Sequence, residues 1–202
     1  DLFRKVRQVV AGGTSRRESV AHGLAALGPD AAWVVVHDGV RPMAGAELIE
    51  RVLEAAREHG AATAAVPVAD TIKRVDESGL VAHTVERAGL WAIQTPQAFA
   101  RNVLERAHAA AGLAGADPRL VAATDDCGLV EAIGHPVAVV PGSRRNLKVT
   151  TVEDLEILEN LVHRHDDVTG RGHGGFTATG FGFDVHRLEE GRPLVLGGVT
   201  IP

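Results

Sequence analysis

The sequence has almost no cysteine, since Cys127 is the single one among its 202 residues. One cysteine cannot build an internal disulfide framework, and no Cys-x-x-Cys pair is present to hold a zinc ion through thiolates. A reducing compartment is therefore the expected environment.

Long apolar runs are also missing. No stretch approaches the roughly 20 continuous apolar residues of a membrane span, and the start, Asp1-Leu2-Phe3-Arg4-Lys5, lacks the apolar core of a secretory signal. We expect no membrane partner and a cytoplasmic location. Because the chain begins without methionine and stops at Ile201-Pro202 directly after an apolar run, we also expect both ends to be cut from something longer.

There is no excess of basic charge. The 21 lysines and arginines are outnumbered by 26 aspartates and glutamates, which argues against a non-specific nucleic-acid binder. With 45% hydrophobic and 23% charged residues the chain has the composition of a globular protein with a packed core, not of a disordered or fibrous one. We expect small-molecule or protein partners and no nucleic acid.

Strand-type apolar runs alternate with segments of helical period for most of the length. This pattern predicts an α/β fold, doubly wound around a mostly parallel sheet. Because the run 33–36 is continuously apolar, we expect it to be buried on both faces. Strands are predicted at 6–10, 33–36, 61–68, 90–93 and 137–140, and helices at 15–28, 48–56, 96–111, 125–133 and 151–163. The helix at 48–56 is expected to end before Gly60.

Residues 71–85 interrupt this alternation. The apolar segments 72–75 and 80–85 flank Asp76-Glu77-Ser78-Gly79, a tetrapeptide typical of a tight turn. The spacing predicts a β-hairpin that projects as an arm from the sheet.

A domain boundary is expected near the end of the sequence. Residues 166–175 are polar and contain four glycines, the composition of a flexible linker. Beyond it, segments 177–188 and 194–201 are predicted as two strands, too few to bury a core alone. We therefore divide the chain into a domain over 1–165, a linker over 166–175 and the start of a second α+β domain over 176–202.

Asp38 and Arg41 are the first candidates for chemistry, because ligands of open α/β sheets bind at the carboxyl ends of strands. Asp38 directly follows the strand predicted at 33–36. A carboxylate there can hold Mg²⁺, although aspartate is as common in an ordinary turn. Arg41 lies in the same loop and can bind a phosphate with its guanidinium fork. The pairing predicts a phosphorylated substrate.

Three further features have a functional and a plain reading. Gly12-Gly13-Thr14-Ser15 precedes a helix, where backbone N–H groups can meet a phosphate or a base edge, or can simply form a loop and an N-cap. Arg87 directly follows the predicted arm, which favours a function, although a lone arginine is usually a solvated surface residue. Lys148 is one of only three lysines, so it is either a point charge for phosphate or a strand-end residue.

Asp184 and His186 are two residues apart, so on a strand both side chains leave the same face. A carboxylate and an imidazole make half of a zinc site. Because no third ligand follows them, a stand-alone zinc-binding protein is an unfavoured reading.

Seven motifs of the first 165 residues resemble methylerythritol-phosphate cytidylyltransferase, in the same order and spacing. They are Gly12-Gly13-Thr14-Ser15-Arg16-Arg17-Glu18-Ser19-Val20, His37-Asp38-Gly39-Val40-Arg41-Pro42, Pro67-Val68-Ala69-Asp70-Thr71-Ile72-Lys73, Thr84-Val85-Glu86-Arg87, Leu90-Trp91-Ala92-Ile93-Gln94-Thr95-Pro96-Gln97, Thr124-Asp125-Asp126 and Asn146-Leu147-Lys148-Val149-Thr150.

After the linker, the sequence is similar to the opening of methylerythritol cyclodiphosphate synthase. The similarity lies in Gly180-Phe181-Gly182-Phe183-Asp184-Val185-His186-Arg187-Leu188 and Leu196-Gly197-Gly198-Val199. The two activities occur fused in some bacteria, as a bifunctional enzyme of non-mevalonate isoprenoid synthesis.

The resemblance implies a Rossmann-like nucleotidyltransferase fold that uses CTP and Mg²⁺. An oxygen of 2-C-methyl-D-erythritol 4-phosphate, a phosphorylated polyol, attacks the α-phosphorus of CTP and pyrophosphate leaves. By resemblance the Mg²⁺ ligand is Asp38, and the nucleotide is bound by Gly13, Thr14, Ser19 and Asp38. The polyol phosphate is bound by Arg41, Thr71, Arg87, Thr95, Thr124 and Lys148, of which Arg87 and Lys148 are catalytic.

The resemblance also bears on assembly and on the second domain. Thr71 and Arg87 belong to an arm that in this family reaches into a partner subunit, so a homodimer is implied. The synthase family forms trimers, so a fused parent can combine both contacts in a larger assembly. Asp184 and His186 are implied ligands of Zn²⁺ or another divalent metal.

The family's glycine-rich phosphate loop lies upstream of anything in this sequence, and the third zinc ligand lies beyond Pro202. We therefore expect the 202-residue chain to be inactive alone and the function to belong to its parent. The alternatives are a ribitol-phosphate cytidylyltransferase, which shares the nucleotide motifs but which the synthase-like tail disfavours, and a non-catalytic dimerisation module of the same fold.

Overall fold

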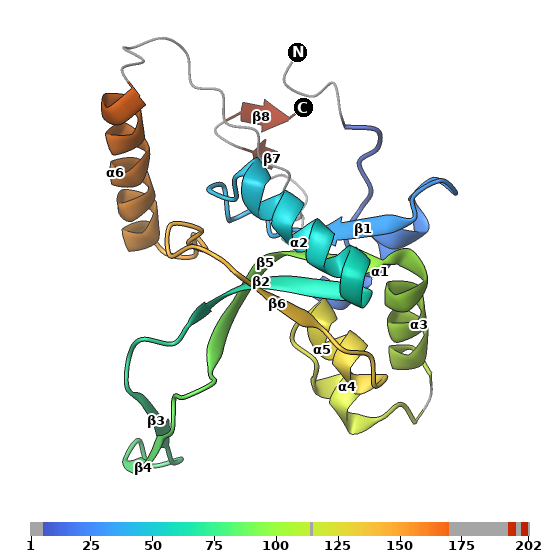
Figure 1. The fold of residues 1–202 in the computed structure, drawn as a ribbon, viewed down its shortest axis with the longest axis horizontal. Helices are drawn as coiled ribbons and strands as arrows, with labels where there is room; N and C mark the ends of the chain where they lie inside the picture. Colours follow the sequence, from blue (N-terminus) through green and yellow to red (C-terminus); the bar gives the residue numbers. More distant parts are fainter. Residues whose placement is uncertain (1–5, 114, 170–193, 197–198, 202) are drawn as a thin grey trace.

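A four-stranded sheet forms the centre of the molecule (Figure 1). The computed structural model describes residues 6–113, 115–169, 194–196 and 199–201. The sheet consists of β1 (Trp33–Val36), β2 (Ala61–Pro67), β5 (Trp91–Ala100) and β6 (Ala138–Pro141), in the order β1-β5-β2-β6. β2 and β6 pair in parallel, and β5 is antiparallel to both β1 and β2. Thus β1, β2 and β6 share one direction and β5 runs between them in the other.

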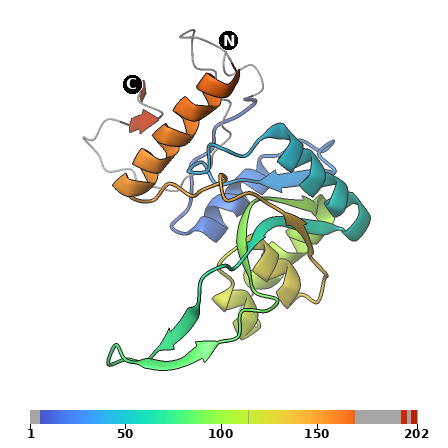
Figure 2. The same ribbon diagram turned by 60° about the vertical axis from the view of Figure 1, so that its left-hand side comes forward.

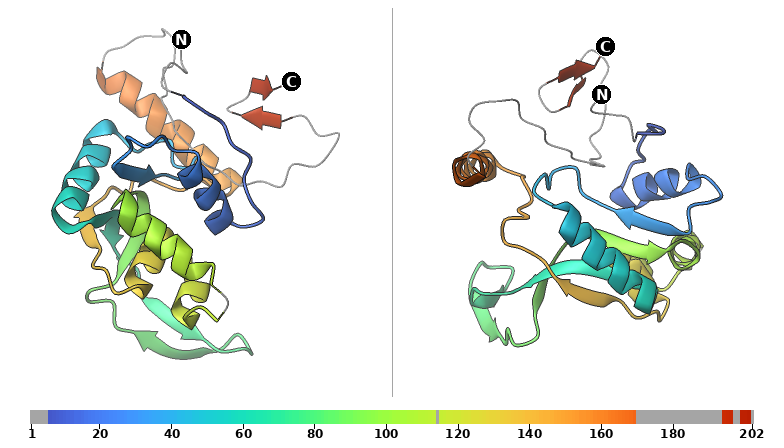
Figure 3. Two further views of the ribbon diagram at one scale, coloured as in Figure 1. Left: turned by 90° about the vertical axis from the view of Figure 1, so that its right-hand side faces the viewer. Right: turned by 45° about the horizontal axis from the view of Figure 1, so that its top comes forward.

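Helices cover both faces of this sheet (Figure 3), so the predicted α/β fold is confirmed. On one face α2 (Ala46–His59) packs Leu48, Val52 and Ala56 over β2, β5 and β6. The other face carries a core around Phe99 and Leu104, both fully buried. The helices of that face are α1 (Arg16–Ala25), α3 (Arg101–Ala111), α4 (Pro118–Ala122) and α5 (Asp126–Ala132).

Local capping signals set the starts of α1 and α5 and the end of α2 as the sequence predicts, whereas α1 ends at Ala25, before the predicted end at Gly28. The Ser15 hydroxyl accepts a hydrogen bond from the Glu18 N–H at 3.1 Å and so caps α1. α2 ends at Gly60, whose φ of 86° lies in the left-handed region that glycine adopts without strain. α5 begins after Asp125, which accepts from the Gly128 N–H at 2.9 Å.

The predicted arm is present as a hairpin of β3 (Ile72–Val75) and β4 (Val81–Val85) that stands away from the sheet (Figure 2). Its turn is held by Asp76, whose Oδ1 accepts from the N–H groups of Ser78 and Leu80 at 2.9 and 3.1 Å. Every residue of β3 is exposed, because the hairpin has no core of its own to rest on.

The strand predicted at 6–10 and the burial predicted for both faces of 33–36 are wrong, although 33–36 itself is a strand as predicted. Residues 6–10 form no strand, and Val9 is 89% exposed, because an apolar run becomes a strand only where a neighbouring strand pairs with it. β1 is not buried on both faces either. Val34 and Val36 are buried but Val35 is 39% exposed, because β1 is an edge strand and α2 packs over the other three strands of the sheet instead.

The predicted helix at 96–111 begins only at Arg101, because residues 91–100 form β5. In the sequence Pro96 is typical of the first residue of a helix. It lies instead where the pairing of β5 with β2 shifts register between Thr63 and Ala65, a place in a sheet that tolerates the missing N–H of proline.

The last helix, α6 (Val152–Thr169), runs beyond its predicted end near His163, so residues 166–169 of the expected linker are helical. The predicted strand at 194–201 is an antiparallel pair, β7 (Leu194–Leu196) and β8 (Val199–Ile201). The expected strand at 177–188 lies outside the described residues, and the domain division stays a prediction. None of the helices in the described part of the chain has the length and hydropathy that crossing a bilayer requires.

Candidate active site

A cavity of about 710 Å³ opens at the end of the sheet where β1 and β6 terminate. Its wall is built from the loop after β1, the middle of β5, the loop after β6, α1 and the segment from α4 to α5. The charged residues of this wall are Arg16, Asp38, Arg41, Arg119, Asp125, Glu131 and Lys148.

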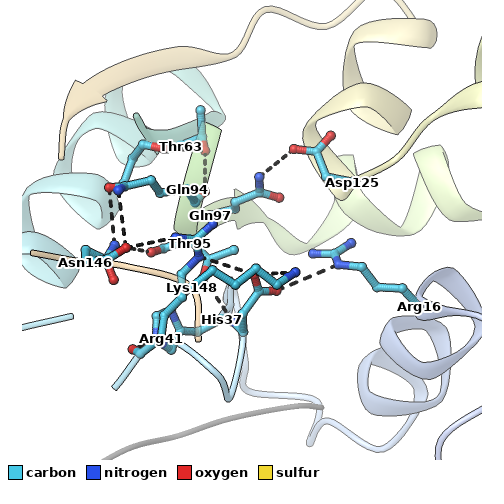
Figure 4. A network of polar contacts seen from close by, with 12 residues as sticks. Arg16, His37, Arg41, Thr63, Gln94, Thr95, Gln97, Asp125, Asn146 and Lys148 are labelled. Atoms are coloured by element: carbon cyan, nitrogen blue, oxygen red, sulfur yellow. Dashed lines mark hydrogen bonds and ion pairs between the residues drawn. The ribbon is translucent and has the colours of Figure 1, made fainter. Parts of the chain in front are cut away.

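Three cations, Arg16, Arg41 and Lys148, gather in one part of the cavity wall (Figure 4), and the carboxylate of Asp38 lies among them. Its Oδ2 lies 3.3 Å from Arg41 Nε and 3.5 Å from Lys148 Nζ, and its Oδ1 lies 4.0 Å from Arg16 Nε. Only 15% of the Asp38 side chain is exposed. Asp38 and the buried Asp126, whose Oδ2 lies 2.7 Å from Arg16 Nη1, offset two of these three positive charges, so this part of the cavity keeps a net positive charge.

His37 and Thr95 hold the loop of Asp38 in place. Thr95 Oγ1 accepts from the Asp38 N–H at 2.9 Å and lies 2.9 Å from His37 Nδ1, while His37 Nε2 lies 3.0 Å from the main-chain oxygen of Arg41. Since that oxygen can only accept, Nε2 carries the proton and Nδ1 accepts from the threonine hydroxyl. Burial lowers the pKa of His37, which agrees with a neutral imidazole.

Asn146 fixes the loop that carries Lys148. Its side chain is fully buried and donates from Nδ2 to the main-chain oxygen of Thr95 at 2.8 Å. Its own main-chain oxygen accepts from Arg41 Nη1 at 2.8 Å. The Val149 N–H also donates to the Val40 oxygen at 2.8 Å. These bonds join the loops after β1 and β6, so Asp38, Arg41 and Lys148 are placed as one unit.

Another part of the wall is acidic. Asp125 accepts from Gln97 Nε2 at 2.6 Å as well as capping α5. Glu131 lies further along α5, and its pKa is raised by burial and, to a lesser degree, by the charge of Asp125. The cavity therefore has a cationic region around Asp38 and an anionic region at α5.

The side chains of the cavity wall can bind a phosphate group by themselves. They can bind a divalent cation only together with substrate phosphates and water. Arginine forks and a lysine ammonium are the usual ligands of phosphate oxygens. Mg²⁺ commonly takes one or two protein carboxylates and completes its shell with substrate phosphates and water. Asp38 fits that pattern, whereas no group of three or more His, Cys, Asp or Glu side chains in the described part of the chain could hold a metal by itself.

A sequence model of the family described as IspD: 2-C-methyl-D-erythritol 4-phosphate cytidylyltransferase matches residues 2–164. The chain belongs to this family. Membership agrees with the resemblance found in the motifs and is consistent with the use of a divalent metal.

Two kinds of relative in the IspD family match the chain, bifunctional enzymes and shorter single enzymes. The chain is 50% identical over 200 residues to the bifunctional enzyme IspD/IspF of Desulforudis audaxviator, covering 99% of this chain and 47% of the relative. It is 48% identical over 160 residues to the 2-C-methyl-D-erythritol 4-phosphate cytidylyltransferase of Pelotomaculum thermopropionicum, covering 79% and 65%. The chain thus spans about half the length of the bifunctional relatives that it matches.

Solved structures of the family share the fold. The cytidylyltransferase of Thermus thermophilus matches with a TM-score of 0.67 and 38% identity, over 76% of this chain and 72% of that one. The bifunctional IspDF of Campylobacter jejuni matches with a TM-score of 0.61 and 26% identity, over 99% of this chain and 47% of that one. The Rossmann-like nucleotidyltransferase fold predicted from the sequence is confirmed by these neighbours.

The structure gathers only part of the predicted IspD site. The predicted residues that line the cavity are Asp38, Arg41, Thr95, Thr124 and Lys148. The loop before α1 does not line it. There the Gly13 N–H donates to Ser19 Oγ at 2.9 Å, and the Thr14 N–H donates to Glu18 Oε2 at 2.6 Å. The role of Gly13, Thr14 and Ser19 in nucleotide binding stays a prediction.

The predicted site residues of the arm do not line the cavity, and those of the tail lie outside the residues that the structure describes. Thr71 and Arg87 flank the arm and do not line the cavity, and Arg87 donates to the main-chain oxygen of Ala69. A contact with a partner subunit stays a prediction for both. Asp184 and His186 lie outside the described residues, so the predicted metal site of the second domain stays a prediction as well.

Sequence reasoning missed six polar or charged residues of the cavity wall, which are Arg16, Gln94, Gln97, Arg119, Asp125 and Glu131. Four of them, Arg16, Gln94, Gln97 and Asp125, stand inside the quoted motifs, but a motif does not say which of its side chains faces the cavity. The strand-end rule overlooked Arg16, because it lies at the start of a helix.

Proposed function

We propose that this chain forms the cytidylyltransferase part of an enzyme that transfers CMP from CTP to 2-C-methyl-D-erythritol 4-phosphate and releases pyrophosphate. The observation that supports it most is the cluster of Arg16, Arg41 and Lys148 around Asp38 in the cavity of an IspD-family fold. Two phosphorylated substrates need such a concentration of positive charge.

The proposed step needs charge and position more than proton transfer. An oxygen of the polyol phosphate forms a bond to the α-phosphorus of CTP, while the bond from that phosphorus to the bridging oxygen breaks and pyrophosphate leaves with the electron pair. The attacking oxygen is already ionised at neutral pH, so no general base is required. Arg41 and Lys148 hold the polyol phosphate, and their loops fix the angle of approach.

The hydroxyl of Thr124 offers a neutral hydrogen bond at the same wall. Thr95 Oγ1 already donates to the His37 ring and accepts from the Asp38 N–H, so it keeps one lone pair that can accept from a polyol hydroxyl but has no proton for a phosphate oxygen. Both ring nitrogens of His37 are occupied by protein groups, so His37 positions the loop and takes no proton from substrate. Asp38 is the residue that would hold Mg²⁺, which when bound neutralises charge on the phosphates.

For the whole protein we propose a second, cyclodiphosphate synthase activity with Zn²⁺ or another divalent metal, and a homodimer formed through the arm. Similarity to bifunctional IspD/IspF over 99% of the chain supports the second activity. The exposed hairpin β3–β4 supports the dimer, since it lacks a core of its own. A cytoplasmic location and the inactivity of the 202-residue chain alone stay predictions.

The deciding experiment measures pyrophosphate release by the natural protein at its full length, with CTP and Mg²⁺ and one polyol phosphate at a time. We expect turnover with 2-C-methyl-D-erythritol 4-phosphate and little with ribitol 5-phosphate. Lys148→Ala should lower kcat/KM by about 100-fold or more, as loss of a charge-stabilising contact does. Preference for ribitol 5-phosphate, or no turnover at all, would overturn the proposal in favour of the alternatives. The same assay on the 202-residue chain tests its predicted inactivity.

A further inference from the structure

Asp126 is a buried carboxylate that joins three helices. None of its side chain is exposed, and it lies at the start of α5. Its Oδ2 accepts from Arg16 Nη1 of α1 at 2.7 Å, and its Oδ1 lies 2.9 Å from His108 Nε2 of α3. Since a carboxylate oxygen only accepts, His108 donates from Nε2.

The ionised state of Asp126 is favoured despite its burial. Burial alone would raise the pKa of Asp126, but the hydrogen bond from His108 and the charge of Arg16 hold it below its usual value. An ionised buried carboxylate is tolerated only where its partners are fixed, so Arg16 and His108 are held firmly against it.

Arg16 is the member of this cluster that reaches the cavity. A third of its side chain is exposed, it lines the cavity, and its Nε lies 4.0 Å from Asp38 Oδ1. Within the described residues, Asp126 is the acceptor at hydrogen-bond distance from its guanidinium. A guanidinium has five N–H donors in a rigid plane, so anchoring through one nitrogen sets the direction of the others. Arg16 thereby shares the Asp38 carboxylate with Arg41 and Lys148, the other two cations of this region.

We propose that Arg16 binds a phosphate group of a substrate in this cavity, and that Asp126, braced by His108, is the positioning residue that orients Arg16 for it. The proposal rests on the proposed function, because it adds a phosphate ligand to the same site. The phosphate belongs either to the nucleotide or to the polyol. The burial of Asp126 explains how a carboxylate can lie beside an arginine that binds phosphate. Asp126 fixes the Arg16 guanidinium, but its own negative charge is shielded from the cavity.

The test is a double-mutant cycle on the natural full-length protein. We expect Arg16→Ala to lower kcat/KM by about 10- to 100-fold, the range expected for a lost charge-assisted hydrogen bond. Asp126→Asn should give a similar loss in the parent but almost none in the Arg16→Ala background, because it acts through Arg16. Arg16→Lys should recover part of the activity. If the KM for CTP rises, Arg16 binds a phosphate of the nucleotide. If the KM for the polyol phosphate rises, Arg16 binds the phosphate of the polyol.

The matched control is Arg106→Ala, since Arg106 is exposed on α3 and has no ion pair in the described part of the chain. It should stay within about twofold of the parent, as exposed positions away from the site usually do. Each variant is assayed well below its own melting temperature, so that a loss of fold is not counted as a loss of rate. An unchanged kcat/KM in Arg16→Ala overturns the role of Arg16. Losses that multiply in the double variant overturn the positioning role of Asp126.

Binding of inorganic pyrophosphate to the same full-length variants, followed by calorimetry, separates this proposal from the proposed function. If the parent shows no cytidylyl transfer, the proposed function fails, but weaker pyrophosphate binding in both Arg16→Ala and Asp126→Asn still supports the phosphate site. If transfer is present and neither binding nor kinetics responds to Arg16→Ala, this inference fails alone.

Discussion

The side-chain amide of Asn146 donates to the main-chain oxygen of Thr95 at 2.8 Å and so ties the loop after β6 to the middle of the sheet. Neither residue touches solvent to any extent, with 0% and 4% exposed. The bond matters because the same loop carries Lys148, whose ammonium lies 3.5 Å from Asp38.

Asn146→Ala should destabilise the protein by about 1–3 kcal/mol, because it leaves a buried carbonyl without its donor. It should also lower kcat/KM, since Lys148 loses its fixed position. Urea unfolding and kinetics measure the two effects. Asn102→Ala, at an exposed position of α3, is the control and should change stability by less than about 0.5 kcal/mol. Equal stability of the two variants would contradict the role given to Asn146.

His37 should make the stability of the fold depend on pH. Its pKa is lowered by burial, so the folded state binds the proton less readily than the unfolded state. The contribution of neutral His37 is therefore present above the ordinary histidine pKa of about 6.5 and is lost as the pH falls below it. Urea unfolding at several pH values on either side of that pKa measures the loss, and His37→Asn should show a smaller dependence. Identical pH profiles for the two proteins would refute this.

Gly60→Ala should destabilise the fold by about 1–3 kcal/mol. Its φ of +86° is unfavourable for alanine, and the added Cβ would lie 2.6 Å from the His135 ring. Gly28→Ala is a matched control, because no atom lies within 4 Å of its added Cβ. That variant should be neutral or slightly more stable. Thermal melts of both compare them directly, and a neutral Gly60→Ala would show that α2 can end without a left-handed residue.

Cys127 should be unreactive in the folded protein, although it lines the cavity wall. Burial, assisted by the charge of Asp125, raises the pKa of its thiol far above the usual range, and the residue is 2% exposed. A colourimetric disulfide reagent at mildly alkaline pH should therefore label the native protein very slowly and the protein unfolded in guanidinium chloride at once. Fast labelling of native protein would mean that α5 opens readily.

The arm gives a test of the proposed homodimer. Val75 and Val81 face each other in the pairing of β3 with β4 and are 52% and 59% exposed. Replacing both with glutamate should halve the mass seen in sedimentation equilibrium, because charges oppose burial of the hairpin against a second copy. Val9→Glu, at a position that is 89% exposed outside the arm, should leave the mass unchanged. A parent protein that is already monomeric would contradict the dimer.

Features that depend on neighbours in the sequence were predicted correctly. The apolar spacing of Leu48, Val52 and Ala56 marks the buried side of α2, and Gly60 marks its end. Asp76 and Gly79 define the turn of the arm. The loop motif of Asp38 also identifies the place of the site, because ligands bind where strands end in this class of fold.

Other features were settled by contacts between distant parts of the chain. Residues 91–100 became a strand because β1 and β2 pair with them on either side, whereas residues 6–10 have a similar apolar pattern and no partner among the described strands. Arg16 and Asp126 are 110 positions apart, so no local pattern reveals their bond. Local sequence was enough to specify the separate elements and the residue types of the site. The tertiary structure alone decided which charged side chains come into contact, because the sheet and helices bring together segments that are distant in the sequence.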